Sequence, residues 1–378
     1  MIIGFDINEA NVAQRVGVNQ VAYELFSHLV GLNSQHQIIA LSKDRPLPDL
    51  SPSSNKLHYE TFGPTKAWVL TGLTKRLFFG KPKIDVLFSP SHYSPLLSKT
   101  PAVIAIMDLS YEHFGAEYFT NYDLNQLKRW TPMSARKAKY IITISEFTKK
   151  EIINRYKTVP DKIIVIHPGI NTAQFHAKIP QTKQLQVKNK FGITGKYFLY
   201  VGTLQPRKNL SRLIQAFKKL ITQEQQGTRN LKLVIGGKKG WLYDQIFQEA
   251  RDLQIADKVI FTGFVPAADL PGLIKASIAY VLPSLYEGFG MPPVEAQSVG
   301  TPVVVSRNSS LPEIVGESGI YIDDATSVAN LKDALKRALK LSKPEREQII
   351  SQGKINAKRF DWDAAANKLI AVLTSAKI

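Results

Sequence analysis

Residues 197–210 read Tyr197-Phe-Leu-Tyr-Val-Gly-Thr-Leu-Gln-Pro-Arg-Lys-Asn-Leu210, and the chain continues with Ser-Arg-Leu-Ile-Gln-Ala-Phe-Lys-Lys-Leu. The apolar run Tyr197–Val201 has the length and composition of a buried strand, and Leu210–Leu220 carries apolar residues at helical spacing. A short turn containing Gly202 joins the two. A strand that leads through a turn into an amphipathic helix is the unit from which parallel sheets covered by helices are built.

The same alternation extends in both directions and forms two consecutive series. The first series predicts strands at Ile2–Ile7, Ile38–Leu41, Val86–Phe88, Val103–Met107, Tyr140–Thr143 and Ile163–Ile166, with helices at Asn19–Val30, Leu124–Ala138 and Glu146–Arg155. The second predicts strands at Tyr197–Val201, Leu231–Ile235, Val259–Thr262, Ile278–Leu282, Pro302–Ser306 and Ile320–Ile322, with helices at Leu210–Leu220, Tyr243–Leu253, Pro293–Val299, Val328–Leu341 and Asp361–Ala376.

The polar stretch Thr172–Lys190 separates the two series and predicts a linker. We therefore expect an α/β protein of two Rossmann-like, doubly wound parallel-sheet domains, residues 1–185 and residues 186–360, that face each other across a cleft. Ligands of such sheets bind beyond the carboxyl ends of the strands, so the cleft is the expected active site. Periodicity does not say on which domain the closing helix packs.

Composition narrows the class of protein. A chain of 378 residues suffices for two or three domains. The absence of cysteine excludes disulfides, thiolate metal ligands and a cysteine nucleophile. The apolar runs are far shorter than the ~20 residues of a membrane-spanning helix. An acid arrives at Asp6 with no basic residue before it, which does not resemble a signal peptide, so we expect a cytoplasmic protein.

Basic residues exceed acidic ones by 18, which favours anionic partners. Two stretches, Pro64–Lys83 and Lys128–Lys139, are basic without any acid, and the first interleaves its charges with aromatic and aliphatic residues. Three interpretations stay open: a solvated basic face, a surface that contacts anionic lipid at the inner face of the membrane, and a nucleic-acid site. No nucleic-acid-binding signature accompanies the charge, which argues against the third.

The most informative stretch is Leu282-Pro-Ser-Leu-Tyr-Glu-Gly-Phe-Gly-Met-Pro-Pro-Val-Glu-Ala296, which follows a strand and enters a helix. Gly288 and Gly290 permit unusual backbone angles and close approach of a ligand. The prolines suit the first helical turn, where N–H groups and the helix dipole favour phosphate or sugar oxygens. Glu287 and Glu295 flank this turn and suit the hydroxyls of a sugar or ribose. A proline-initiated helix with an acid in its first turn would explain Glu295 alone, but not the whole string.

A basic pair, Arg207 and Lys208, lies in the turn after Tyr197–Val201. A planar guanidinium and a point-charge ammonium can together hold a diphosphate, although adjacent basic residues on a loop are often merely solvated. Either Asn209 or Ser211 can cap the helix that follows.

A third candidate is Gly17, in Gln14-Arg-Val-Gly-Val18 between the first strand and the first helix. Phosphate-binding loops occupy this position in many parallel-sheet domains. The three spaced glycines of a dinucleotide fingerprint are absent, so this signal is weak by itself.

Several of these strings resemble glycosyltransferase family 4, a large group of retaining enzymes with the two-domain GT-B architecture. In the second half they are Val201–Leu210, Phe261-Thr-Gly-Phe-Val-Pro266, Leu282–Ala296 and Leu311-Pro-Glu-Ile-Val-Gly316. Weaker similarity in the first half covers Arg15–Val18, Met107-Asp-Leu-Ser-Tyr111, Glu117-Tyr-Phe119, Thr143-Ile-Ser-Glu-Phe-Thr148 and His167-Pro-Gly-Ile-Asn171. The resemblance spans nearly the whole chain and points to bacterial mannosyl- and glucosyltransferases.

The resemblance implies a role for each matching residue. Arg207 and Lys208 would hold the donor diphosphate and stabilise the departing nucleotide, Glu287 would lie near the donor sugar, and Glu295 would meet the ribose. The remaining implied donor-binding residues are Gly17, Gly202, Thr203, Phe264, Val265, Gly288, Phe289 and Gly290. The helix after Phe360-Asp-Trp362 is similar to the family's crossover, which would join residues 361–378 to the first domain.

The acceptor side is less clearly marked. Many family members carry a histidine where this chain has Met107, so that residue's role has no counterpart here. Asp108 either lines the acceptor cleft or serves as a cap or a polar core residue. His92 and His113 either replace the missing histidine or are ordinary loop residues. Asp361-Trp-Asp363 superficially matches a metal-binding acid pair of another glycosyltransferase fold, and we interpret it as a helix cap beside a packed tryptophan.

By this resemblance the protein is a retaining transferase of surface polysaccharide synthesis. It would move a hexose from a nucleoside diphosphate sugar, GDP-mannose first and UDP-glucose second, to a hydroxyl of a glycan or lipid-linked acceptor. We expect no cofactor and no metal, because Arg207, Lys208 and helix N-termini can stabilise the leaving diphosphate. Two alternatives stay open: a nucleotide-sugar epimerase of the same architecture, and a non-catalytic nucleic-acid or glycan-binding protein. Both leave the string Glu287–Glu295 unexplained.

Overall fold

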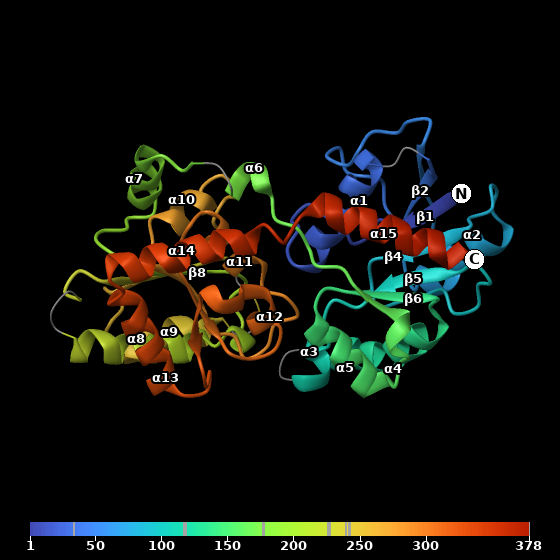
Figure 1. Ribbon diagram of the computed structural model, residues 1–378. Helices are drawn as coiled ribbons and strands as arrows, with labels where there is room; N and C mark the ends of the chain where they lie inside the picture. Colours follow the sequence, from blue (N-terminus) through green and yellow to red (C-terminus); the bar gives the residue numbers. More distant parts are fainter. Residues whose placement is uncertain are drawn as a thin grey trace. The chain divides into compact units, whose positions relative to one another are not determined.

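The computed structural model describes residues 1–32, 35–115, 119–175, 178–224, 228–238, 240 and 243–377. The chain forms two compact units, each a parallel sheet covered by helices (Figure 1). Unit 1 comprises Met1–Gly169 and Asp361–Ile378, and unit 2 comprises Ile170–Phe360. The expected fold class, two Rossmann-like parallel-sheet domains, is confirmed.

Unit 1 contains a seven-stranded sheet of order β3-β2-β1-β4-β5-β6-β7 in which every pairing is parallel. Its strands are β1 (Ile2–Asp6), β2 (Gln37–Ser42), β3 (Leu57–Thr61), β4 (Val86–Ser89), β5 (Ala102–Ala105), β6 (Tyr140–Thr143) and β7 (Ile163–Val165). Its helices are α1 (Val18–Leu32), α2 (Thr74–Phe79), α3 (Ser110–His113), α4 (Asn121–Lys137), α5 (Glu146–Tyr156) and α15 (Trp362–Lys377), with short helical turns at Val69–Leu73 and Pro160–Lys162. Helix α15 packs beside α1, so the end of the chain completes the unit in which it began.

Unit 2 contains a six-stranded parallel sheet of order β10-β9-β8-β11-β12-β13. Its strands are β8 (Tyr197–Val201), β9 (Lys232–Gly236), β10 (Val259–Gly263), β11 (Ala279–Leu282), β12 (Val303–Ser306) and β13 (Gly319–Ile322). Its helices are α6 (Thr172–Phe175), α7 (Gln181–Lys190), α8 (Leu210–Gln223), α9 (Asp244–Asp252), α10 (Leu270–Lys275), α11 (Met291–Ser298), α12 (Leu311–Val315), α13 (Val328–Leu339) and α14 (Lys343–Ala357), with 3-10 turns at Pro206–Lys208 and Gly316–Ser318. In Figure 1, α8, α9 and α13 gather on one side of the sheet and α7, α10 and α14 on the other.

Helix α8 shows why the apolar pattern produces this architecture. Its fully buried residues recur at helical spacing and form one apolar stripe: Leu210, Leu213, Ile214, Ala216, Phe217 and Leu220. Burying one large aliphatic or aromatic side chain stabilises the fold by about 1.5–3 kcal/mol. This stripe packs into the core that the β8 side chains Tyr197–Tyr200 also enter.

The expected linker at Thr172–Lys190 is wrong. Residues Gln181–Lys190 form α7, which packs against α10 and buries Val187, while α6 buries Phe175. Both helices belong to unit 2, so the chain divides after Gly169, before residue 185. One buried residue per helix is too little to produce visible apolar periodicity.

Both sheets reverse their strand order at one internal point. In unit 1 the order turns between β1 and β4, and in unit 2 it turns between β8 and β11. The loops that leave the carboxyl ends of two such strands run to opposite sides and open a crevice, which is where doubly wound sheets bind ligands. Arg207, Lys208 and Glu287 follow β8 and β11, whereas Phe264 and Val265 follow β10 and Asp108 follows β5.

Candidate active site

The basic pair and the glutamate string meet at the β8/β11 crevice of unit 2. The 3-10 turn Pro206–Lys208 follows β8, and Glu287 follows β11. Lys208 Nζ donates a hydrogen bond to Glu287 Oε1 at 2.5 Å, and Arg207 Nη1 lies 3.4 Å from Glu287 Oε2 and 3.0 Å from the carbonyl oxygen of Tyr286. These three groups therefore lie together at the crevice of unit 2.

Neighbouring serines hold Glu287 in place. Ser284 Oγ donates to Glu287 Oε1 at 2.6 Å, and the backbone N–H of Glu287 donates to Ser309 Oγ at 3.0 Å. Ser310 Oγ donates to the carbonyl oxygens of Glu287 (2.8 Å) and Phe289 (3.0 Å). These serines are not among the residues predicted from the sequence. Ser309 and Ser310 follow β12, the neighbour of β11 in the sheet, and this pairing of strands is not visible in a single sequence.

The ionisation of Glu287 depends on its two cations. Glu287 is only 6% exposed, and burial opposes its negative charge. Lys208 and Arg207 outweigh that effect, so the pKa of Glu287 lies below its ordinary value. The carboxylate in turn fixes both cations at the mouth of the crevice, where an incoming anion would meet oriented donors.

The glycine turn between the two glutamates bends into α11. Gly290 has φ +98° and precedes the helix, and a Cβ there would lie 2.7 Å from Leu311 Cδ2. Gly288 is buried. The Phe289 ring is also buried and meets Phe360 edge to face at 5.4 Å, so this side chain serves the core while its backbone faces the serines.

Glu295 lies in the second turn of α11, so the interpretation of an acid in the first turn is wrong. Burial raises its pKa to about 7. Among the residues that the structure describes, no side chain or N–H donates a hydrogen bond to its carboxyl group. A partly buried carboxyl group with unused acceptor positions is suited to bind hydroxyls.

Gly202 and Thr203 leave β8 beside the neighbouring strand. The N–H of Gly202 donates to the carbonyl oxygen of Gly236 at 3.0 Å, and a Cβ at Gly202 would lie 2.8 Å from the hydroxyl of Tyr200. That hydroxyl donates to the carbonyl oxygen of Thr203 at 3.0 Å. Both residues therefore shape the backbone at the crevice.

The expected cap of α8 is not made by the Asn209 side chain. Asn209 begins the helix with φ +62°, and its Nδ2 donates to the carbonyl oxygens of Pro283 (3.0 Å) and Ala325 (2.6 Å). The left-handed backbone turns the amide away from the helix amides, and the side chain instead ties the basic turn to the loop after β11.

Phe264 and Val265, two of the implied donor-binding residues, follow β10. Phe264 is 64% exposed, which is unusual for so large an apolar side chain, and Val265 is buried. An exposed aromatic face can stack on a nucleobase.

Gly17 lies in unit 1, directly before α1. It is exposed, has φ +54°, and a Cβ there would meet no atom within 4 Å. The backbone angle explains the glycine, and the open space around it leaves room for a ligand.

His92 and Asp108 lie close together at the carboxyl ends of β4 and β5. Burial lowers the pKa of His92 and the Asp108 charge opposes this shift. His92 Nδ1 has no hydrogen-bond partner among the described residues, and the ring packs on Tyr111 at 5.7 Å. Asp108 Oδ1 accepts the N–H of Ser110, the first residue of α3, at 2.9 Å, although the cap position itself is occupied by Leu109. A role of Asp108 on the acceptor side stays a prediction.

His113 lies in α3 and pairs with Glu151 Oε1 at 2.5 Å on the surface of unit 1. His113 is therefore a helix residue and not the loop residue of one interpretation, and its role on the acceptor side stays a prediction. The neighbouring motif residues Glu117 and Tyr118 lie outside the part of the chain that the structure describes.

Asp6 is a further candidate that was not predicted from the sequence. This buried carboxyl ends β1, accepts the N–H (3.1 Å) and Nδ2 (2.7 Å) of Asn8, and accepts Ser89 Oγ from β4 at 3.2 Å. Burial raises its pKa to about 6 although these hydrogen bonds oppose the shift. Its position at the end of the first strand was the available signal, because it bridges the two strands that flank the crevice of unit 1.

Asp361 directly precedes α15 and Asp363 lies in its first turn, and both make structural contacts. Asp361 Oδ1 accepts the N–H of Ala364 at 2.8 Å, Trp362 is buried, and Asp363 pairs with His28. Within the described ranges, no group of three or more histidine and acidic residues gathers as metal ligands would. In the same ranges, no helix is both long and apolar enough to cross a bilayer.

Known structures share this architecture over the whole chain. A sucrose-phosphate synthase from Thermosynechococcus elongatus superposes with a TM-score of 0.77 at 18% identity, covering 99% of this chain and 98% of that one. Anabaena HepE in complex with UDP and glucose gives a TM-score of 0.77 at 17% identity, covering 99% of both chains. The fold is that of the GT-B glycosyltransferases.

Family comparison agrees with the fold. Residues 181–356 match the family described as Glycosyl transferases group 1, and residues 16–174 match Glycosyltransferase Family 4. The two matches leave only the ends and a short stretch between them uncovered. The chain belongs to the family 4 glycosyltransferases.

The names of two curated relatives describe them as O-antigen chain mannosyltransferases. The O-antigen chain mannosyltransferase B of Escherichia coli is 32% identical over 260 residues, 67% of this chain and 65% of the relative. The O-antigen chain mannosyltransferase RfbU of Salmonella typhimurium is 32% identical over 214 residues, 54% of this chain and 55% of the relative. The match therefore spans less than two thirds of either relative.

Proposed function

We propose that this protein transfers a hexose from a nucleoside diphosphate sugar to a hydroxyl of a glycan or lipid-linked acceptor, with retention of the anomeric configuration. The observation that carries the proposal is the cluster of Arg207, Lys208 and Glu287 at the β8/β11 crevice. A crevice with two oriented cations and a carboxylate fits a diphosphate joined to a sugar.

The proposed chemistry depends on stabilising the leaving group. The bond between the anomeric carbon and the diphosphate oxygen breaks, negative charge develops on the diphosphate, and the sugar becomes oxocarbenium-like. Lys208 and Arg207 stabilise that charge because Glu287 already orients them, so little reorganisation is needed. The acceptor oxygen forms the new bond on the same face, and its proton passes to a diphosphate oxygen. We assign no side-chain nucleophile.

We also propose that the reaction needs no metal or cofactor. The two cations supply positive charge at the diphosphate, so a chelator such as EDTA should leave the rate unchanged. Loss of activity on chelation, restored by a divalent ion, would contradict this part of the proposal.

We propose mannose as the sugar, from GDP-mannose, and surface polysaccharide synthesis as the setting. The names of the two O-antigen mannosyltransferases support this choice. UDP-glucose is the second candidate donor, since HepE was solved with UDP-glucose. Glu295 would accept hydrogen bonds from the ribose, and Phe264 would stack on the base.

The test is a screen of nucleotide sugars by thermal shift, followed by product analysis. We expect one donor to raise the melting temperature and to lose its sugar to water or to an added acceptor. An isomerised donor without transfer would identify an epimerase instead. A salt-sensitive shift of random oligonucleotides, with no donor affinity, would identify a binding protein.

A further inference from the structure

Lysines precede three neighbouring strands of unit 1. Lys99 lies three residues before β5, Lys139 directly before β6 and Lys162 directly before β7. These strands are parallel neighbours in the sheet, so their amino ends meet at one edge. This amino edge is opposite the carboxyl edge that carries Asp6, His92 and Asp108.

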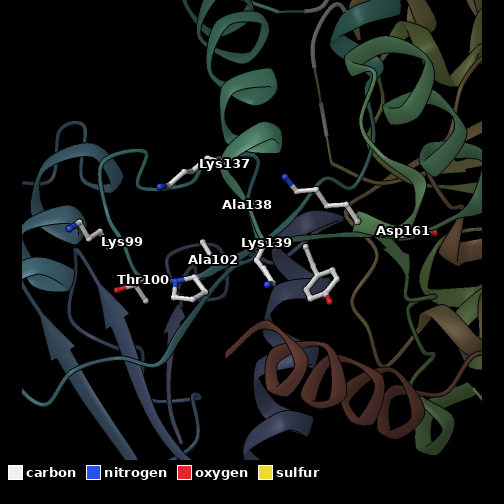
Figure 2. Close-up of a pocket in the computed structure, with 10 residues that line it drawn as sticks. Lys99, Thr100, Ala102, Lys137, Ala138, Lys139 and Asp161 are labelled. Carbon is white, nitrogen blue, oxygen red and sulfur yellow. The ribbon is translucent and has the colours of Figure 1, made fainter. Parts of the chain in front are cut away.

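A pocket of about 550 Å³ opens at this edge, a size within the range of small-molecule sites, which is roughly 300–1,000 Å³. Lys99, Lys137, Lys139 and Lys162 line it, together with apolar groups that include Ala102 and Ala138. Figure 2 shows Lys137 and Lys139 where α4 leads into β6, and Lys99 on the separate segment that leads into β5. Asp161 is the one acid in the lining, so the residues around the pocket carry a surplus of positive charge.

Internal contacts do not neutralise this charge. None of the four ammonium groups has an ion-pair partner within the described residues. Lys162 Nζ donates to the carbonyl oxygen of Arg136 at 2.7 Å and so caps the end of α4, and burial lowers its pKa. Lys137 and Lys162 lie near the carboxyl end of α4, where the negative end of the helix dipole stabilises positive charge, so a structural role explains their position. The helix dipole does not account for Lys99 and Lys139, which come from the strand-entry segments.

We propose that this amino-edge pocket binds a phosphate group, either of a free diphosphate or of an anionic phospholipid headgroup. A phosphate carries several acceptor oxygens and more than one negative charge, so one group can accept hydrogen bonds from several lysines together. Lys99, Lys137 and Lys139 are exposed, so a phosphate group can reach them directly from solvent. The site is separate from the donor crevice, which lies in unit 2.

The test compares two triple variants of equal charge. The pocket variant is K99Q/K137Q/K139Q, which keeps the Lys162 cap of α4. The matched control, K343Q/K358Q/K368Q, removes three exposed lysines that have no ion-pair partner among the described residues and lie outside the pocket. Both variants keep Arg207 and Lys208, so a thermal shift by the donor sugar should be the same in each.

The two sources of phosphate are distinguished by separate probes. Pyrophosphate is titrated calorimetrically into each protein, and sedimentation is measured with phosphatidylcholine vesicles with and without phosphatidylglycerol. If the source is free diphosphate, the pocket variant loses a site or binds about tenfold more weakly than the control, as expected when several charge-assisted contacts are lost. If it is a headgroup, only sedimentation with phosphatidylglycerol falls. Equal behaviour of the pocket variant and the control with both probes would overturn the proposal.

Discussion

At the scale of single residues, the Lys208–Glu287 pair is the critical contact of the crevice. Removing two charges from water is costly, and a buried pair repays that cost only when its remaining groups are hydrogen-bonded. Here Ser284 and Arg207 complete the coordination of the carboxylate. The pair is therefore better explained as an arrangement that orients cations for an anion than as a device for stability.

Changing Glu287→Gln should destabilise the fold and reduce transfer. Two cations then lose their counter-charge, and we expect a loss of roughly 1–3 kcal/mol in the free energy of unfolding near pH 7. Because the pKa of Glu287 is lower in the folded state, its contribution is present above the ordinary value of 4.5 and is lost as the pH falls through the folded value. Urea unfolding at pH 7 and pH 4 should show a difference between wild type and variant that shrinks in acid. A difference independent of pH would contradict the assignment.

Glu295 should make donor binding depend on pH. Its pKa is about 7, and only the carboxylate accepts two hydroxyl hydrogen bonds. Donor affinity should therefore fall about tenfold as the pH drops from about 8 to about 6. Isothermal titration at both values checks this, and in Glu295→Gln the dependence should disappear. A wild-type affinity that does not change over this range would remove Glu295 from the ribose contact.

The ionised form of Glu295 should also lower the stability of the fold. A carboxyl group with a raised folded pKa weakens the fold as the pH rises from its ordinary value of 4.5 to about 7. Without donor at pH 8, Glu295→Gln should therefore melt at a higher temperature than wild type.

At the scale of elements, the turn into α11 depends on one glycine. Gly290→Ala would force an L residue into φ +98° and place its Cβ 2.7 Å from Leu311 Cδ2. Gly17→Ala would also force an L residue into a positive φ, +54°, but its Cβ would meet no atom within 4 Å. We expect Gly17→Ala to lower the free energy of unfolding by about 1–2 kcal/mol, the usual penalty of left-handed backbone. Gly290→Ala should cost clearly more, since a steric clash is added. Denaturant unfolding of the two variants checks the order, and equal losses would contradict it.

Buried periodic elements were predictable from the sequence, and marginal ones were not. The expected helix Leu210–Leu220 is α8, and the expected strand Tyr197–Val201 is β8, because their buried faces are continuous. Edge strand β3 was missed because only Leu57 of its five residues is buried. Helix α14 was also missed, although Ser342 and Glu345 form a capping box whose spacing was visible in the sequence.

Site residues were predictable from the sequence only where each lies in a short stretch of distinctive residues. Arg207, Lys208 and Glu287 stood out because glycines and prolines surround them. Ser309 and Asp6 did not, because their importance comes from neighbouring strands of the sheet, which a single sequence does not display.

At the scale of the whole molecule, the surplus of 18 basic charges should show in membrane binding. Only part of the basic stretch Pro64–Lys83 is available to contact lipid headgroups, because Trp68 is buried and Arg76 pairs with Glu60. Phe79, however, is 79% exposed in helix α2, which also carries Lys75.

We expect the protein to sediment with anionic vesicles at low salt and to be released as salt rises, because screening weakens contacts between lysines and headgroups. Phe79→Ser should reduce this binding, and Leu185→Ser, which alters an exposed apolar residue of α7, should not. Absence of sedimentation at low salt would show that the protein does not bind anionic membranes.

Lys208, held by Glu287, should stabilise the departing diphosphate. The most direct measurement is the rate of sugar transfer by Lys208→Ala, compared with Lys343→Ala, an exposed lysine of α14. Circular dichroism and a melting curve establish that both variants fold. We predict that Lys208→Ala loses about 10²–10³-fold in kcat while Lys343→Ala keeps the wild-type rate. A folded Lys208→Ala protein that transfers sugar at the wild-type rate would contradict the account.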